Sequence, residues 1–167
     1  MSDKERQFLT LGIDLEGVSV LVVGGGVVGL RKAGILVAHG ALVTVVDPRP
    51  SAALEAAATA GEVRCTEARY AVEHLAGHSL IIAATDDAEV NRRIAAHARA
   101  GGQLCCLVSD SANSQVLFPA MHRWGDVTVA LHTNAQSCKR AVAAREHLAG
   151  LPAPPLEDVT PGGRDAR

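Results

Sequence analysis

Aromatic residues are scarce in this sequence: one Trp, one Tyr and two Phe are spread over 167 residues. Apolar residues still make up 48% of the chain, which is enough to bury a core without help from metals or disulfides. Val, Leu, Ile and Ala must therefore fill that core. The length favours one compact domain with a small appendage.

Long hydrophobic runs and a strong charge of one sign are also missing. The N-terminal segment MSDKERQFLTLGIDLEG lacks the apolar run of a signal peptide or a membrane-spanning helix. The net charge is −2 with 20% charged residues, which argues against nucleic acid or a membrane surface as a partner. We therefore expect a cytoplasmic protein.

The cysteines and histidines show no metal-ligand spacing. No cysteine pair is spaced C-x-x-C, and the adjacent Cys105 and Cys106 would point to opposite faces of a strand. The seven histidines are scattered, without an H-E-x-x-H or similar pattern, so no metal site is expected. We interpret the cysteines as small apolar filler in a reducing compartment.

Buried strands and helices alternate along most of the chain. Continuous β-branched and apolar runs are typical of parallel strands that are covered on both faces. They predict strands at 18–23, 41–46, 63–66, 79–84 and 103–108. Helices are expected between them at 27–38, 51–60 and 87–100. The alternation predicts an α/β fold, a Rossmann-type doubly wound parallel sheet.

The pattern changes after the fifth strand. Residues 115–120 and 127–133 predict an antiparallel hairpin, and 135–148 predict a final helix. The tail that follows is rich in Pro and Gly and is expected to be disordered. The expected parts are therefore 1–112, 113–150 and 151–167.

A glycine-rich loop carries the strongest chemical signal. Gly24, Gly26 and Gly29 spell G-x-G-x-x-G between the first strand and the first helix. They allow, in turn, a tight turn, the approach of a pyrophosphate to the backbone, and close packing of helix on strand. The free N–H groups of the helix start then face the phosphates. The expected phosphate-binding residues are Gly24, Gly25, Gly26, Val27 and Val28.

An acidic residue ends the second strand. With this residue present, the alternative that the glycines serve only to form a tight turn is the weaker interpretation. Asp47 lies 18 positions beyond Gly29 and can bind both hydroxyls of an adenosine ribose. Its carboxylate would repel a 2′-phosphate, which favours NAD over NADP. Arg49 is close enough in sequence to tolerate that phosphate, so the choice of cofactor stays open.

Polar residues also follow the fourth and fifth strands, at the sheet edge where ligands bind in open α/β folds. Thr85, Asp86 and Asn91 are candidates for the cofactor site, although Asp86 and its neighbour Asp87 could instead cap a helix. Asp110 could take a proton or orient a substrate N–H. The alternative for Asp110 is an ordinary turn residue.

The segments LEGVSVLVVGGGVVGLRKAGIL, VTVVDP, LIIAATDDAEVN, CLVSD and FPA together resemble precorrin-2 dehydrogenase, the module that also forms the N-terminal part of sirohaem synthase. The resemblance covers about residues 9–149. It implies NAD-dependent oxidation of precorrin-2 to sirohydrochlorin, with Asp110 as the catalytic aspartate. It also implies a homodimer formed through the hairpin and the last helix. The residues that would contact or shape the NAD site are Gly24, Gly26, Asp47, Thr85 and Asn91.

The sequence departs from that family where some of its members insert iron. Leu107 stands where the family often has Asn, and HTNAQSC at 132–138 replaces an S-x-G-x-S-P element. The additional helical segment of the longer members is also missing, so iron insertion is not expected.

The replacement stretch has candidate roles of its own. Thr133 or Asn134 could cap the last helix. Lys139 and Arg140, and also Arg145, could hold the carboxylates of the tetrapyrrole or form a solvated helix face. His132 could assist proton transfer, contact a metal or have no catalytic use.

Another class of protein shares the cofactor motifs. An NAD-sensing regulatory domain has the glycine loop, the acidic strand end and the polar fourth-strand loop, but it needs no catalytic Asp110. A short-chain reductase is disfavoured because its Tyr-x-x-x-Lys motif is missing: the only tyrosine is Tyr70, and His74 stands four positions later.

Overall fold

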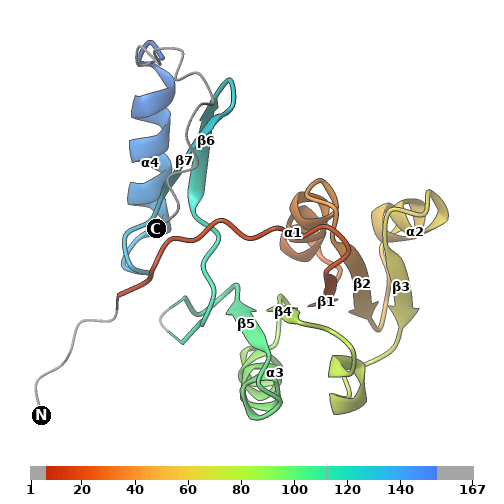
Figure 1. The fold of residues 1–167 in the computed structure, drawn as a ribbon. Helices are drawn as coiled ribbons and strands as arrows, with labels where there is room; N and C mark the ends of the chain where they lie inside the picture. The colour runs from red at the N-terminus through yellow and green to blue at the C-terminus, as the bar shows by residue number, and fades with distance from the viewer. Residues whose placement is uncertain (1–6, 112, 154–167) are drawn as a thin grey trace, which may run out of the picture. The chain divides into compact units, whose positions relative to one another are not determined.

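The computed structural model describes residues 7–111 and 113–153, which form two compact units (Figure 1). The larger unit is Leu9–Phe118. The smaller unit combines the chain before Leu9 with the chain from Pro119 onward. The tail expected to be disordered lies outside the described residues from position 154.

The larger unit contains a five-stranded parallel sheet with the strand order β3-β2-β1-β4-β5. Its strands are β1 (Ser19–Val23), β2 (Leu42–Asp47), β3 (Arg64–Glu67), β4 (Leu80–Ala83) and β5 (Leu104–Leu107). Its helices are α1 (Val27–Val37), α2 (Ala52–Thr59), α3 (Ala88–Ala100) and the short 3-10 helix η1 (Val72–Leu75). The predicted doubly wound α/β fold is confirmed, and only η1 was missed in this unit.

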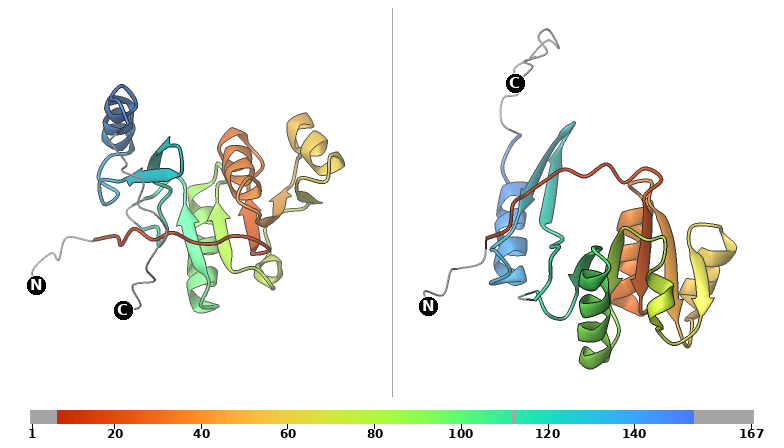
Figure 2. Two further views of the ribbon diagram at one scale, coloured as in Figure 1. Left: turned by 45° about the horizontal axis from the view of Figure 1, so that its top comes forward. Right: turned by 60° about the horizontal axis from the view of Figure 1, so that its bottom comes forward.

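Alternate residues of the strands pack on opposite faces of the sheet, which is why the strands read as continuous apolar runs. On one face, Val20 and Val22 of β1 pack with Leu36 of α1 and Leu54 of α2. On the other face, Leu21 and Val23 pack in a second cluster with residues of α3 and η1. Figure 2 shows the helices of this unit lying on both sides of the sheet.

The cysteines of the sheet belong to this core. Cys105 and Cys106 are buried on opposite faces of β5, as the strand alternation predicts. Burial raises the pKa of the Cys105 thiol to about 12, and it also raises the pKa of Cys106. Thiols in such surroundings stay protonated at neutral pH and are inert, which agrees with their interpretation as apolar filler.

In the smaller unit, a two-stranded antiparallel sheet of β6 (Ala120–Trp124) and β7 (Val127–Leu131) precedes α4 (Cys138–Ala149). The prediction of the first hairpin strand at 115–120 was wrong. A two-residue turn joins Trp124 to Val127, so the strand must directly precede that turn. Pro119 has no N–H for the ladder and stands just before the strand. Within the described part of the chain, no helix is long and apolar enough to cross a membrane.

The last helix begins three residues later than predicted, at Cys138. Its cap is neither Thr133 nor Asn134: the Ser137 side chain accepts a hydrogen bond from the Arg140 N–H. Asn134 and Ala135 adopt positive φ angles of 49° and 68°, which interrupt the helix pattern. They form the centre of a turn closed by the Gln136 N–H, which donates to the Thr133 carbonyl (2.9 Å).

Ala135→Gly is expected to stabilise the protein by about 1 kcal/mol, because alanine is strained in the left-handed region and glycine is not. Thermal unfolding should show a rise in Tm of a few degrees. Ala144→Gly, on the exposed surface of α4, is the control and should lower the Tm. An unchanged or lower Tm for Ala135→Gly would contradict the strain argument.

Candidate dinucleotide-binding site

The glycine loop follows β1 and turns directly into α1. The Gly24 N–H donates to the Val46 carbonyl (2.9 Å), and Gly24 has a φ of +102°, which favours glycine. A Cβ at Gly24 would lie 2.5 Å from the carbonyl oxygen of Ala84, the residue just after β4. A Cβ at Gly29 would overlap the carbonyl oxygen of Gly24 itself. These two glycines therefore let helix α1, the loop and the sheet approach each other.

Gly26 differs from both of these glycines. It is exposed, its φ is −70°, and a Cβ built on it would have no atom within 4 Å. It is the N-cap residue of α1, no side chain caps this helix, and the first turn holds no acidic residue. The positive end of the helix dipole and the N–H groups at Val27 and Val28 are thus available to an anion. The space beside Gly26 fits the pyrophosphate of a dinucleotide.

Asp47 ends β2 and is oriented by the same loop. Its Oδ2 accepts a hydrogen bond from the Gly25 N–H (2.6 Å), and its Oδ1 accepts one from the Arg49 N–H (2.8 Å). A Cβ at Gly25 would lie 2.5 Å from Leu54 Cδ2, so the missing side chain lets the loop pack on α2. Each carboxylate oxygen keeps a further acceptor position, which suits the two hydroxyls of a ribose.

Asn91 holds the loop after β4. It is 2% exposed, and its Oδ1 accepts hydrogen bonds from Thr85 N (3.1 Å) and Thr85 Oγ1 (2.8 Å). Its Nδ2 donates to the Thr85 carbonyl (2.8 Å) and to Ser109 Oγ (3.4 Å). Asn91 therefore ties the loop after β4 to the loop after β5, and it shapes the site from below the surface.

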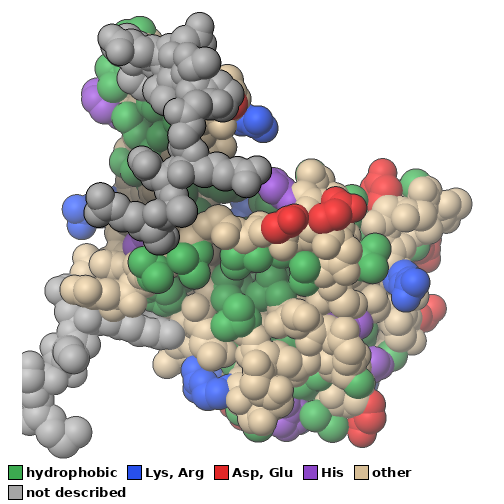
Figure 3. Space-filling view, viewed as in Figure 1, with side chains coloured by type: hydrophobic (Ala, Val, Ile, Leu, Met, Phe, Trp, Pro, Cys, Tyr) green, Lys and Arg blue, Asp and Glu red, His purple; other side chains and the backbone are tan. Residues whose placement is uncertain are grey.

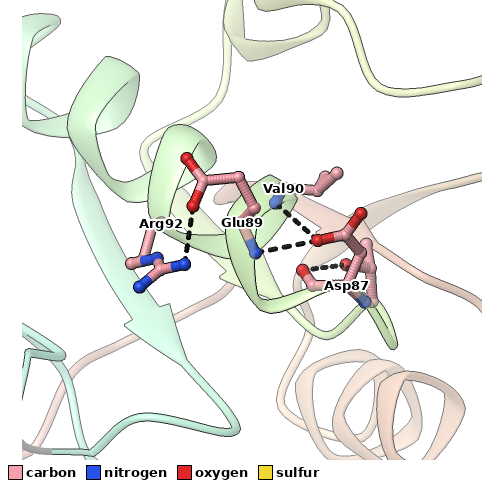
Figure 4. Close-up of polar contacts among 5 residues, drawn as sticks. Asp87, Glu89, Val90 and Arg92 are labelled. Carbon is pink, nitrogen blue, oxygen red and sulfur yellow. Dashed lines mark hydrogen bonds and ion pairs between the residues drawn. The ribbon is translucent and has the colours of Figure 1, made fainter.

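Asp87 serves as the N-cap of α3, one of the two roles that the sequence allowed. Its Oδ1 accepts hydrogen bonds from Glu89 N (2.8 Å) and Val90 N (3.2 Å), as Figure 4 shows. Glu89 in turn pairs with Arg92 on the exposed surface of the helix (2.6 Å). Asp86 is exposed in the same loop.

Asp110 follows β5 on a loop with its own supports. Its Oδ2 accepts a hydrogen bond from Asn113 Nδ2 (2.8 Å), and its Oδ1 accepts one from Asn113 N (3.2 Å). Ser114, which is 1% exposed, accepts from Leu107 N (2.9 Å) and donates to the Val116 carbonyl (2.7 Å). Neither support was predicted from the sequence, although the Asp-x-x-Asn spacing is typical of a side chain that closes a turn.

The parallel register brings these loops to one edge of the sheet. Val23 pairs with Val46 and with Ala83, and Ala83 pairs with Leu107. The site residues predicted for the larger unit lie at the end of β2, in the loops after β1, β4 and β5, and in the first turns of α1 and α3. These are Gly24, Gly25, Gly26, Val27, Val28, Asp47, Thr85, Asp86, Asn91 and Asp110.

The predicted substrate residues lie in the smaller unit. Lys139 and Arg140 are exposed in the first turn of α4. Arg145 pairs with Glu146 (3.1 Å). His132 Nδ1 accepts a hydrogen bond from Asn134 N (3.2 Å). Among the described residues, no group of three His, Cys, Asp or Glu side chains is placed to hold a metal ion.

Comparisons with known proteins agree with this geometry. A family model described as "Putative NAD(P)-binding" matches residues 11–120. The chain is 39% identical over 145 residues to a siroheme synthase of Chromobacterium violaceum, and 44% identical over 115 residues to one of Ectopseudomonas mendocina. These matches cover 87% and 69% of this chain, but only 31% and 24% of the relatives. The chain thus spans about a third or less of the length of these curated relatives.

A solved structure also shares the fold. The structure titled SirC, precorrin-2 dehydrogenase, is 29% identical to this chain and superimposes with a TM-score of 0.76. The match covers 85% of this chain and 70% of the other. The match to the family model spans most of the chain and contains the glycine loop, Asp47, Thr85 and Asp110. The chain therefore belongs to this NAD(P)-binding family.

Proposed function

We propose that the chain binds NAD and oxidises precorrin-2 to sirohydrochlorin. The observation that carries this proposal is the placement of Asp110 on the same sheet edge as the glycine loop and Asp47. The curated relatives described above are siroheme synthases, and the matching solved structure is a precorrin-2 dehydrogenase. None of these is a regulatory NAD sensor, so the comparisons favour the enzyme over that alternative.

The reaction removes two electrons and two hydrogens from the substrate. NAD, when bound, supplies the acceptor for a hydride. The second hydrogen leaves as a proton, and we assign the Asp110 carboxylate as its acceptor or as the group that orients the substrate N–H. Asn113 holds both Asp110 oxygens, so the carboxylate presents its remaining acceptor positions in a fixed direction. The products are sirohydrochlorin, NADH and one proton.

The substrate is polyanionic, and the start of α4 suits such a ligand. Lys139 and Arg140 lie in the first turn of that helix, where two cations oppose the helix dipole. A bound carboxylate would offset this cost, so we propose both residues, with His132, as substrate contacts. Leu107, which stands where the family often has Asn, is buried in the core and 3% exposed. The leucine side chain has no atom that binds a metal, and we propose that the reaction stops at dehydrogenation.

We also propose a cytoplasmic homodimer with no nucleic-acid or membrane partner. Leu9, Leu11 and Ile13 are 81%, 67% and 59% exposed on a non-helical segment. Alternate apolar side chains of this kind favour burial against another protein surface. Figure 3 shows hydrophobic side chains exposed on the face drawn, and Lys and Arg side chains dispersed over it. Residues 1–112 would then bind the cofactor, and residues 113–150 would form the dimer or substrate contacts.

Asp110→Asn tests the assignment of the catalytic residue. The amide keeps the shape of the side chain but cannot accept the proton, so kcat is expected to fall by roughly a hundredfold or more. NAD affinity should change little. Turnover is measured anaerobically from NADH absorbance with precorrin-2 and NAD, and affinity by calorimetry. Asp126→Asn, in the exposed turn of the hairpin, is the matched control and should retain activity.

Two outcomes would contradict this assignment. Full turnover by Asp110→Asn would remove Asp110 from the chemistry. A wild-type chain that binds NAD but leaves precorrin-2 unchanged would favour the regulatory NAD-sensing domain.

A further inference from the structure

A second acidic residue ends the strand next to Asp47. Asp47 and Glu67 are the last residues of β2 and β3, and they are register partners in the parallel ladder. Partners in a parallel pair direct their side chains to the same face of the sheet. On that face, Val45 of β2 and Cys65 of β3 both pack in the cluster beneath α1 and α2. The two carboxylates therefore lie side by side above this cluster.

The pKa of the Cys65 thiol reflects the carboxylates near the ends of β2 and β3. Burial raises its pKa, and the negative charges of Asp47, Glu55 and Glu67 raise it further. Glu55 lies in the first turn of α2, so three elements contribute carboxylates. Arg49 adds a positive charge in the loop after β2, but it is exposed and its backbone N–H supports Asp47. The charges that raise the Cys65 pKa are thus all negative, and Glu67 places one of them beside Asp47.

We propose that Glu67 is a second determinant of cofactor choice, which acts with Asp47 to exclude a dinucleotide that carries a 2′-phosphate. This inference rests on the proposed binding of the adenosine ribose at Asp47. The 2′-oxygen of that ribose is a hydrogen-bond donor in NAD and carries a phosphate in NADP. Glu67 needs no contact with the ribose, because its charge acts on the phosphate through space. It is therefore a specificity residue and not a catalytic one.

The test compares the affinities of the full chain for NAD and NADP by calorimetry, with Glu67→Gln, Glu67→Lys and the wild type. The ratio of the NADP Kd to the NAD Kd is expected to fall roughly three- to tenfold in Glu67→Gln and further in Glu67→Lys. The NAD Kd should change by less than about twofold, since NAD carries no phosphate on the ribose that Asp47 would bind. Raising the salt from about 0.05 M to about 0.5 M should shrink the effect.

Glu62→Gln is the matched control. Glu62 is exposed just before β3, at the opposite end of the strand from Glu67, and it loses the same charge. Its affinity ratio should stay at the wild-type value. An unchanged ratio in both Glu67 variants, or an equal change in Glu62→Gln, would overturn the inference. The readout is affinity and not turnover, so a changed ratio in a chain that fails to oxidise precorrin-2 supports this inference and contradicts only the proposed reaction.

Discussion

Gly26→Ala is expected to weaken dinucleotide binding severely while it leaves the fold intact. The added methyl group has no protein atom within 4 Å and a permitted φ of −70°, so the folded chain accommodates it. The same methyl group occupies the space through which a pyrophosphate must approach the start of α1. We expect the NAD Kd to rise by about a hundredfold or more, which corresponds to roughly 3 kcal/mol.

The measurement is a pair of experiments on one protein sample. Calorimetry gives the NAD Kd, and thermal unfolding gives a Tm that should fall by no more than a few degrees, since alanine is a poorer N-cap than glycine by about 1 kcal/mol. Gly34→Ala is the control on the exposed side of the same helix, where a Cβ also meets nothing within 4 Å. It should bind NAD normally. Normal binding by Gly26→Ala would contradict the assignment of the phosphate site.

Gly29→Ala is expected to unfold or severely destabilise the larger unit. Its Cβ would overlap the carbonyl oxygen of Gly24, and Gly24 cannot withdraw because its own Cα faces the backbone of Ala84 at close range. Helix α1 would have to move away from β1, whose Val20 and Val22 are fully buried in the core. Overpacking of this kind costs about 3 kcal/mol or more.

For a chain of this length, such a loss lowers the Tm by about 10 °C or prevents soluble expression. Circular dichroism against temperature measures it, again beside Gly34→Ala, which should be as stable as the wild type or slightly more so. The two variants add the same methyl group to the same helix and differ only in the surroundings of that methyl group. A Gly29→Ala chain with an unchanged Tm would show that the loop and helix are less tightly packed than described.

The larger unit could be predicted from the sequence because its signals are local. Its strands are continuous apolar runs closed by Gly, Asp or polar residues, and the predicted bounds lie within one residue of those observed. Helix α2 begins where predicted, with Ser51 as its cap, since the Ser51 Oγ accepts a hydrogen bond from Leu54 N (3.3 Å). The position of Asp47 at a strand end also follows from the sequence alone.

The features that were missed depend on neighbours in space or on backbone angles. The 3-10 helix η1 is too short for a periodic pattern. The turn at Asn134 and Ala135 uses positive φ angles without glycine, which composition does not reveal. Ser114 can accept a hydrogen bond from Leu107 N because the next residues lie beside the edge strand β5. There, the N–H groups of Gln115 and Val116 donate to the Cys105 carbonyl. Such contacts are visible only once the strand and the loop are placed together.

The structure also refines how the candidate site is built. Asn91 was expected to contact or shape the NAD site, and its hydrogen bonds to Thr85 and Ser109 show how it shapes the loops. For Asp110, the alternative interpretation was an ordinary turn residue. Its hydrogen bonds from Asn113 do make it part of a turn, and they leave acceptor positions on both carboxylate oxygens. A structural contact and a chemical role are therefore compatible at Asp110.

The central claim is that this chain transfers a hydride from precorrin-2 to NAD. The most direct measurement is an anaerobic stoichiometry, in which wild-type protein is incubated with precorrin-2 and NAD and both products are followed by absorbance. The account predicts one NADH formed for each sirohydrochlorin, and neither product when NAD is omitted. NAD binding without formation of either product, or sirohydrochlorin formed without NADH, would contradict it.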